Sequence, residues 1–163
     1  SLSCFQKEAL INWLKEYPDS LKIALTDTID INTFLGDFSF DLANKYNGVR
    51  HDSGDPFRWA NLMINHYKKI GVNVSDKTLI FSDSLSFNKA QTINDVYSPQ
   101  IETIFGIGTF LTCDLQNVTP ANIVIKLELC ENKPVAKISD EPNKSICKDP
   151  AFLKKLYKVF KIN

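Results

Sequence analysis

The fold is decided by the stretch GVRHDSGDP, which spans Gly48–Pro56. It begins as an apolar strand, and side chains along a strand point alternately to its two faces. Arg50 and Asp52 therefore share one face and His51 lies on the other. Pro56 is favoured at the first position of a helix, where its missing N–H costs no hydrogen bond. The stretch predicts a strand that passes through a polar turn into a helix.

The same strand with a polar end recurs on both sides of this stretch. The other apolar runs are Leu21–Leu25, Thr78–Phe81 and Ile101–Phe105, and the polar residues that follow them are Thr26–Thr28, Ser82–Asp83 and Gly106–Thr109. Successive polar ends are about 25 to 31 residues apart, which is the length of one strand and one helix. Four such βα units predict an α/β fold with a parallel sheet whose strands all end at one rim.

Helix signals fill the intervals between these strands. Ser3 and Gln6 predict a capping box at the start of a first helix. A second helical stretch begins at Asp30, breaks in the region of Gly36, and has Gly48 as its predicted C-terminal stop. Two further helices are predicted from Pro56 to Gly71 and from Ser86 onward.

The pattern changes after Thr109. The segments Ile123–Leu129 and Pro134–Ile138 predict an antiparallel β-hairpin. Apolar residues at helical spacing then predict a C-terminal helix, with Phe152, Leu156, Val159 and Phe160 on its buried face. A closed α/β barrel has eight parallel strands, so four strands cannot close one. We therefore expect residues 1–163 to form one partial domain, whose edge strands pair with an N-terminal segment that this chain lacks.

Composition and charge exclude several classes of function. The 19 basic and 19 acidic residues leave a formal net charge of zero, so bulk charge does not recruit nucleic acid or an anionic membrane. No apolar run approaches the roughly 18 to 20 residues of a membrane span. The four cysteines lie far apart, and His51 and His66 have no Cys or His partner at metal-ligand spacing. We expect a cytoplasmic protein with reduced thiols and no structural zinc site.

Ligands of α/β folds bind beyond the carboxyl ends of the strands. Arg50 and Asp52 can point together into a cavity there, and a plain salt bridge is the alternative interpretation. Gly106, Gly108 and Thr109 can let backbone N–H groups cradle a phosphate, with a tight turn as the alternative.

Two further carboxylates follow strands at the same rim. Asp27 and Asp83 favour contacts with hydroxyl groups or a metal ion, although Asp is also common as a helix cap. A phosphate cradle, an arginine and several carboxylates on one rim suit a phosphorylated sugar. The residues themselves carry the prediction no further.

Six motifs in unbroken order make the sequence recognisable: ALTDT at 24–28, GVRHDSGDP at 48–56, FSDSL at 81–85, FGIGTFLTCD at 105–114, NIVIKL at 122–127 and KPVAKISD at 133–140. Together they resemble the C-terminal part of nicotinate phosphoribosyltransferase, from about Leu10 to the end of the chain. Six motifs in register are far more specific than any one of them.

The resemblance implies a reaction and a fold. Members of the family join nicotinate to 5-phosphoribosyl 1-pyrophosphate, giving nicotinate mononucleotide and pyrophosphate in the salvage route to NAD. ATP hydrolysis is coupled to this reaction, and Mg²⁺ accompanies the pyrophosphate substrate. The implied fold is an N-terminal domain followed by an irregular α/β barrel, of which this chain would be the C-terminal half. The implied assembly of the intact enzyme is a homodimer.

The resemblance also implies roles for residues in the matching motifs. Arg50 would contact the pyrophosphate or the base, and Asp52, Asp83 and Asp27 would lie near the ribose hydroxyls or Mg²⁺. The 5-phosphate would be held by Gly106, Gly108 and Thr109. We treat Arg50, Asp52 and Asp83 as candidate catalytic residues. The remaining candidates, for substrate binding, are Asp27, Thr28, Ser53, Ser82, Gly106, Gly108 and Thr109.

The sequence also departs from the family pattern. The histidine that the family phosphorylates lies in a motif upstream of this chain, and neither His51 nor His66 occupies that place. The N-terminal aromatic residues that stack on nicotinate are absent too. We therefore expect the 163-residue chain alone to be inactive.

Two other functions stay open at this point. One is a non-catalytic module that binds a phosphorylated sugar. The other is a nicotinamide-specific phosphoribosyltransferase, which shares the Arg-x-Asp-Ser-Gly pattern and a glycine-rich phosphate loop. His51, where that relative tends to carry proline, and the motifs ALTD and KPVAKISD favour the nicotinate enzyme.

Overall fold

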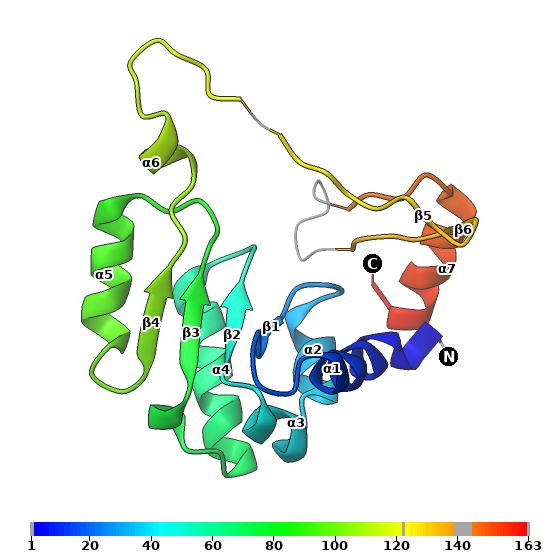
Figure 1. Cartoon of the computed structure of the whole chain (residues 1–163), viewed down its shortest axis with the longest axis horizontal. Coiled ribbons are helices and arrows are strands. Elements are labelled where there is room, and N and C mark those ends of the chain that lie inside the picture. Colours follow the sequence, from blue (N-terminus) through cyan, green and yellow to red (C-terminus); the bar gives the residue numbers. More distant parts are fainter. Residues whose placement is uncertain (1, 122, 139–144, 163) are drawn as a thin grey trace.

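A computed structural model describes residues 2–121, 123–138 and 145–162. Asn122 of the NIVIKL motif and residues 139–140 of KPVAKISD lie outside the described residues. Four parallel strands form one sheet in the order β1-β2-β3-β4 (Figure 1). Their bounds are Ile23–Leu25, Gly48–His51, Thr78–Phe81 and Glu102–Phe105. The α/β prediction with four parallel strands is confirmed, although β1 is shorter than the run Leu21–Leu25.

Helices α2 to α5 occupy the intervals between the four parallel strands, α1 precedes β1, and α6 and α7 follow β4 (Figure 1). Their bounds are Phe5–Glu16 (α1), Ile31–Asp37 (α2), Phe40–Lys45 (α3), Pro56–Ile70 (α4), Phe87–Tyr97 (α5), Thr109–Thr112 (α6) and Pro150–Phe160 (α7), with 3-10 turns at Leu2–Cys4 (η1) and Val74–Asp76 (η2). The break between α2 and α3 confirms the predicted division of the second helical stretch.

Side-chain caps mark the start of four of these helices, of which α2, α4 and α5 lie between strands of the parallel sheet and α7 is capped by Asp149. Asp30 accepts a hydrogen bond from Thr33 N at the start of α2, and Asp55 accepts one from Arg58 N at the start of α4. Ser86 caps α5 in the same way. Gly71 ends α4 with φ of 79°, a left-handed conformation that glycine adopts without steric cost. The starts of α2, α4 and α5 and this stop agree with the sequence prediction.

The predicted capping box at the N-terminus is wrong. The helix α1 begins at Phe5 with Cys4 as its N-cap, and no side chain caps it. Gln6 turns inward instead, and its Nε2 donates to Asp37 Oδ2 over 3.2 Å. The glutamine thus joins α1 to α2, a contact between distant segments that a local motif cannot reveal.

The predicted role of Gly48 as a helix stop is also wrong. The helix α3 ends at Lys45, and Gly48 is the first residue of β2. A Cβ atom on Gly48 would lie 2.1 Å from the carbonyl oxygen of Thr78 on β3. Glycine is required there because the two backbones approach each other closely.

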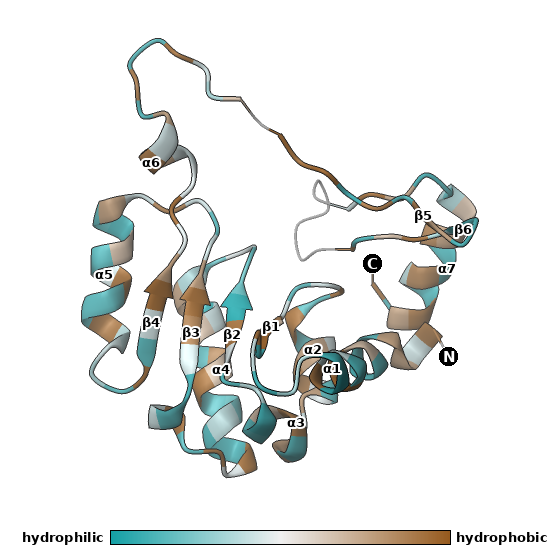
Figure 2. Cartoon of the chain, viewed as in Figure 1, coloured by the Kyte–Doolittle hydropathy of each residue, from teal (hydrophilic) through white to brown (hydrophobic). Residues whose placement is uncertain are grey.

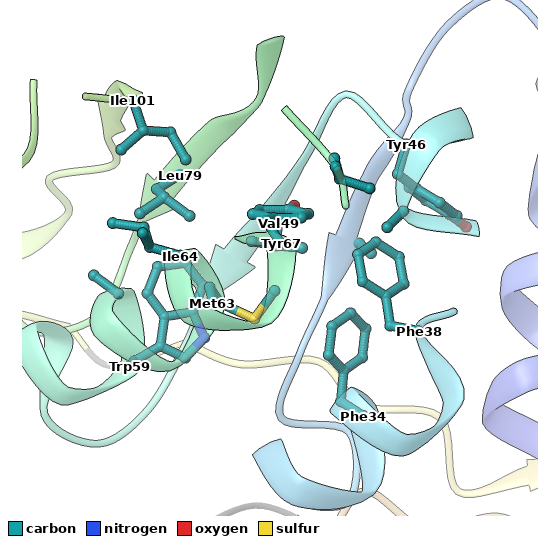
Figure 3. Packing of buried hydrophobic residues seen from close by; sticks show 14 of the residues in the cluster. Phe34, Phe38, Tyr46, Val49, Trp59, Met63, Ile64, Tyr67, Leu79 and Ile101 are labelled. Carbon is teal, nitrogen blue, oxygen red and sulfur yellow. The ribbon is translucent and has the colours of Figure 1, made fainter. Parts of the chain in front are cut away.

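The core lies between the sheet and the helices that cover one of its faces. Val49 and Leu79, in the middle of β2 and β3, are fully buried in a cluster that also contains Phe38 and Tyr67 (Figure 3). The ring of Phe38 lies 4.7 Å from that of Phe34. The opposite face of the sheet carries the register row Leu25, Arg50, Ile80 and Ile104, which is only partly buried.

The C-terminal segment is far less buried. The predicted hairpin exists, but its strands are only Leu129–Cys130 (β5) and Lys133–Pro134 (β6). Residues 123–128 form no strand, and Ile125 is 94% exposed in an apolar stretch of the extended segment (Figure 2). The alternating pattern there is that of a strand, but no strand of the described residues pairs with it.

The C-terminal helix forms as predicted. Within α7, Leu156 is buried, and Phe160 packs edge-on against Phe5 with ring centroids 5.7 Å apart. Its lysines face solvent, as expected for the polar side of an amphipathic helix. The helix therefore returns the C-terminal segment to the start of the chain (Figure 1).

Candidate functional site

The carboxyl ends of the parallel strands meet at one rim of the sheet (Figure 1). At this rim Ser53, after β2, donates to Asp27, after β1, with an Oγ–Oδ2 distance of 2.7 Å. Ser82, after β3, donates its Oγ to the carbonyl oxygen of His51 over 2.8 Å. The structure therefore brings residues from three successive strand ends into direct contact, as the parallel arrangement predicts.

Asp27 is the most deeply buried carboxylate of the rim, with 2% of its surface exposed. Its oxygen Oδ2 accepts from Ser53 and lies 3.6 Å from the ammonium nitrogen of Lys137. A buried carboxylate is tolerated only where hydrogen bonds and a cation compensate for lost hydration. Asp27 does not cap a helix, because the N-cap of α2 is Asp30.

Arg50 and Asp52 point to the same side of β2, as strand alternation predicts. Their side chains form an ion pair with Nη2 and Oδ1 3.6 Å apart, and they are 42% and 28% exposed. A partly exposed pair at this distance contributes little to stability, about 0 to 1 kcal/mol. The salt bridge considered as the alternative interpretation is therefore present. Because the pair is weak and Arg50 is partly exposed, its guanidinium group remains accessible to an anionic ligand.

Lys137 is the site residue that sequence reasoning missed. It follows β6, and its Nζ lies 3.0 Å from Asp52 Oδ2 and 3.6 Å from Asp27 Oδ2. It stands 85 residues from Asp52 in the chain. The motif KPVAKISD contains it, but a single lysine in a predicted hairpin carries no sign of a distant carboxylate partner.

A buried layer of hydrogen bonds supports these side chains from below. The indole Nε1 of Trp59 donates to Thr26 Oγ1 over 2.8 Å, and Thr26 Oγ1 donates to the carbonyl oxygen of Arg50 over 3.1 Å. Trp59 comes from α4 and Thr26 from the end of β1. This chain of bonds fixes the backbone from which the Arg50 side chain emerges.

His51 belongs to this supporting layer. It is 1% exposed and lies against the rings of Trp59 and Phe81. Burial lowers its pKa, and the nearby carboxylate of Asp83 only partly opposes that effect. The neutral imidazole donates from Nε2 to the carbonyl oxygen of Gly54 over 3.1 Å. His51 thus holds the turn that presents Asp52 and Ser53.

The other candidates at this rim have simpler surroundings. Asp83 is half-buried and accepts from Ser84 Oγ over 3.3 Å. Thr28 is half-buried and lines an apolar cavity of about 250 Å³ between α1 and β1. That cavity includes Gln6, whose Oε1 is buried without a hydrogen-bond partner among the described residues. The structure thus places Thr28 beside α1.

The glycine-rich turn follows β4. Gly106 N donates to the carbonyl oxygen of Phe81 over 2.8 Å, which keeps the turn against the end of β3. Gly108 is the N-cap of α6, and Thr109 is the first residue of that helix. A Cβ atom on Gly108 would meet nothing within 4 Å, so packing does not require glycine there. The turn is exposed and its first N–H groups have no partner within the helix.

The ligand groups of the rim are oxygens and cations rather than a preformed metal cluster. In the described part of the chain, no three or more His, Cys, Asp or Glu residues are arranged to hold a metal ion. All four cysteines are free thiols. None of the described helices has the length and apolar character needed to cross a membrane.

Comparisons with known proteins place the chain among its relatives. The profile of the nicotinate phosphoribosyltransferase (NAPRTase) family matches residues 1–163. Nicotinate phosphoribosyltransferase of Proteus mirabilis is 53% identical over 157 residues, which are 96% of this chain and 39% of that protein. The Shigella boydii enzyme of the same name is 53% identical over 155 residues, covering 95% of this chain and 39% of its own length.

Solved structures of the same name share the fold. Nicotinate phosphoribosyltransferase from Vibrio cholerae superposes with a TM-score of 0.95 at 46% identity, covering 100% of this chain and 40% of that one. The Porphyromonas gingivalis enzyme gives a TM-score of 0.90 at 32% identity, covering 98% of this chain and 43% of its own. The chain therefore spans about two fifths of the length of these relatives.

Proposed function

The chain belongs to the nicotinate phosphoribosyltransferase family, and we propose that it supplies the phosphoribosyl-binding rim of such an enzyme. The proposed reaction joins nicotinate to 5-phosphoribosyl 1-pyrophosphate and releases pyrophosphate, as a step toward NAD. The observation that carries the proposal is the run of alternating charges Arg50, Asp52, Lys137 and Asp27 at the carboxyl ends of β1 and β2. Such a rim offers both cations and oxygen acceptors to a phosphorylated sugar.

We propose that β1 to β4 belong to an irregular α/β barrel in the longer protein. Each strand pairs with its neighbours in sequence order, and the described helices leave the face that carries Arg50 only partly buried (Figure 1). Barrels have this arrangement, in which the uncovered face looks toward the barrel interior. Arg50 lies on that face, in one register row with Leu25 and Ile80. The row would then form a layer of the barrel interior below the substrate.

Each end of the substrate has a matching set of residues. The backbone N–H groups of Gly108 and Thr109 would hold the 5-phosphate, together with the Thr109 hydroxyl, while Gly106 keeps the turn against β3. Asp52 and Asp83 offer acceptor oxygens to the ribose hydroxyls. Arg50, which is 42% exposed, would contact the pyrophosphate.

The chemistry needs charge stabilisation more than proton transfer. Bond breaking at the anomeric carbon gives a cation-like sugar while pyrophosphate leaves with growing negative charge. Fixed carboxylates beside the ribose and a guanidinium beside the leaving group stabilise both charges. The ring nitrogen of nicotinate attacks with its own lone pair, so no general base is required. The buried, neutral His51 supports the turn and takes no part in proton transfer.

Mg²⁺ and ATP are proposed as companions of the substrate. Protein-bound Mg²⁺ usually keeps several waters and binds one or two carboxylates plus substrate phosphates. Asp52 and Asp83 are half-buried carboxylates after neighbouring strands, so they fit a metal ion that arrives with pyrophosphate. When bound, the ion neutralises charge on the leaving group. Coupled ATP hydrolysis and a homodimer are proposed for the longer protein from its family membership.

The test compares the two arginines of the chain in the longest polypeptide that contains it. Arg50→Ala should lower kcat/KM by roughly 100- to 200-fold, equivalent to about 3 kcal/mol of lost transition-state stabilisation. Its melting temperature should stay close to that of the unchanged protein, because the Arg50–Asp52 pair is weak. Arg58→Ala is the matched control, since Arg58 is exposed on α4.

Base choice is measured in the same assay. Nicotinate and nicotinamide are supplied in competition, and the products are separated by chromatography. Preferential formation of nicotinate mononucleotide supports the proposal. Preference for nicotinamide would favour the related nicotinamide enzyme, and binding of phosphoribosyl pyrophosphate without turnover would favour a binding module. Unchanged turnover in Arg50→Ala would return this arginine to a structural role.

A further inference from the structure

The ammonium group of Lys137 lies between two carboxylates from neighbouring strands. Its Nζ is 3.0 Å from Asp52 Oδ2, after β2, and 3.6 Å from Asp27 Oδ2, after β1. The lysine side chain is 25% exposed, and the Asp27 side chain is 3% exposed. Two carboxylates that face one another repel, and a shared cation removes that repulsion. Lys137 is therefore placed to hold the two carboxylates side by side.

The backbone of Lys137 is held as well as its side chain. Its N–H donates to the carbonyl oxygen of Ile146 over 3.1 Å, and Ile146 N donates back to Lys137 O over 2.9 Å. The next residue, Ile138, is 3% exposed and anchors the segment in the protein interior. The ammonium group thus extends from a fixed point, which a loose surface lysine would not have.

Stability accounts for only part of this arrangement, because the Lys137–Asp52 pair keeps part of its exposure to water. Ion pairs that keep part of their exposure to water contribute little to folding, because solvent screens them. Asp27 also accepts a hydrogen bond from Ser53, so the lysine is one of two groups that compensate for its burial. What the lysine adds is a defined position for the carboxylates that face the substrate.

We infer that Lys137 is a positioning residue, which orients the Asp27 and Asp52 carboxylates toward the phosphoribosyl substrate without touching it. This inference rests on the proposed function of the rim. It gives the segment after β6 a role in the site. This role is not evident from the sequence, because the segment is far along the chain from the other site residues. It also predicts that Lys137 acts only through its carboxylate partners.

The experiment uses the longest polypeptide that contains this chain, with variants Lys137→Met, Lys137→Arg, Asp52→Asn and the double variant Asp52→Asn/Lys137→Met. Lys133→Met is the matched control, because Lys133 lies exposed on the same hairpin. Steady-state kinetics give kcat and KM for phosphoribosyl pyrophosphate with Mg²⁺. Calorimetric titration gives its affinity without turnover, and a melting curve monitors folding.

The expected loss for Lys137→Met is about 10- to 100-fold in kcat/KM, the range found where residues that orient ligand groups are removed. Lys137→Arg should recover most of that loss because it keeps the charge. The kcat/KM of the double variant should be close to that of Asp52→Asn, because the effects of coupled residues are not additive. Lys133→Met should match the unchanged protein.

Three outcomes would overturn the inference. Lys137→Met could retain full kcat/KM, or it could lower only the melting temperature. The losses of the two single variants could also multiply in the double variant, which would mean that Lys137 contacts the substrate independently. If the unchanged protein binds phosphoribosyl pyrophosphate but forms no nucleotide, the proposed reaction fails and the calorimetric cycle alone decides the role of Lys137. If it binds none, both proposals fail.

Discussion

The sheet region, residues 23–105, and the C-terminal segment, residues 109–162, contain similar kinds of side chain and bury them very differently. Among the described residues of the C-terminal segment, Ile138 and Leu156 are the buried apolar side chains. In the sheet region Phe34, Phe38 and Tyr67 are almost completely buried. Hydrophobic residues are buried only where another layer of the protein covers them. The described helices cover one face of the sheet, whereas residues 123–128 form no strand.

The two regions nevertheless meet at the candidate site. Lys137 comes from the weakly buried segment, and its carboxylate partners Asp27 and Asp52 come from the sheet region. Packing density and site chemistry are therefore separate properties in this protein. The sheet region supplies the rim carboxylates, and the C-terminal segment supplies a cation, Lys137, that faces two of them.

The largest expected effect contrasts the two regions directly. Phe38→Ala should lower the free energy of unfolding by about 3 to 5 kcal/mol, because it opens a cavity among buried aromatic rings. Ile125→Ala should change it by no more than about 0.5 kcal/mol, because Ile125 is 94% exposed. Urea titration followed by circular dichroism measures both. Similar losses in the two variants would break the contrast.

A smaller effect is expected from crowding between strands. Gly48→Ala should cost about 3 kcal/mol, since the added methyl group would lie 2.1 Å from Thr78 O and force β2 away from β3. Gly108→Ala, at the start of the C-terminal segment, should be nearly neutral because nothing lies within 4 Å of its Cβ position. The same urea titration distinguishes them. A neutral Gly48→Ala would contradict the close approach of the strands.

The smallest effect concerns the pH dependence of the sheet region. Burial lowers the pKa of His51 in the folded protein below its ordinary value of 6.5. Below pH 6.5 the His51 side chain is therefore protonated to a greater extent in the unfolded chain than in the folded protein. The contribution of neutral His51 to the free energy of unfolding is thus present above pH 6.5 and is lost as the pH falls. The loss cannot exceed about 1.4 kcal/mol per pH unit. Melting temperatures between pH 8 and 5 should fall less in His51→Gln, and identical slopes would contradict the assignment.

Much of the fold could be predicted because its signals are local. Asp30, Asp55 and Ser86 mark helix starts through bonds to N–H groups three residues on. Parallel strands with polar ends predict a shared rim, and the Asp27–Ser53 contact lies there. The errors at Gln6 and Gly48 have one cause. Each residue is determined by a partner far away in the chain, Asp37 and Thr78, rather than by its neighbours.

The sequence by itself determined the order of strands and helices, the family resemblance, and the placement of Arg50, Asp52 and His51 on opposite faces of one strand. These follow from backbone geometry and periodicity, which act over a few residues. Only the tertiary structure decided that Lys137 joins Asp27 and Asp52, and that the apolar residues Ile123, Val124, Ile125 and Leu127 stay exposed. Ion pairing and burial depend on which parts of the chain come into contact. Lys137 and Asp52 are 85 positions apart, so the residues around each of them do not indicate this contact.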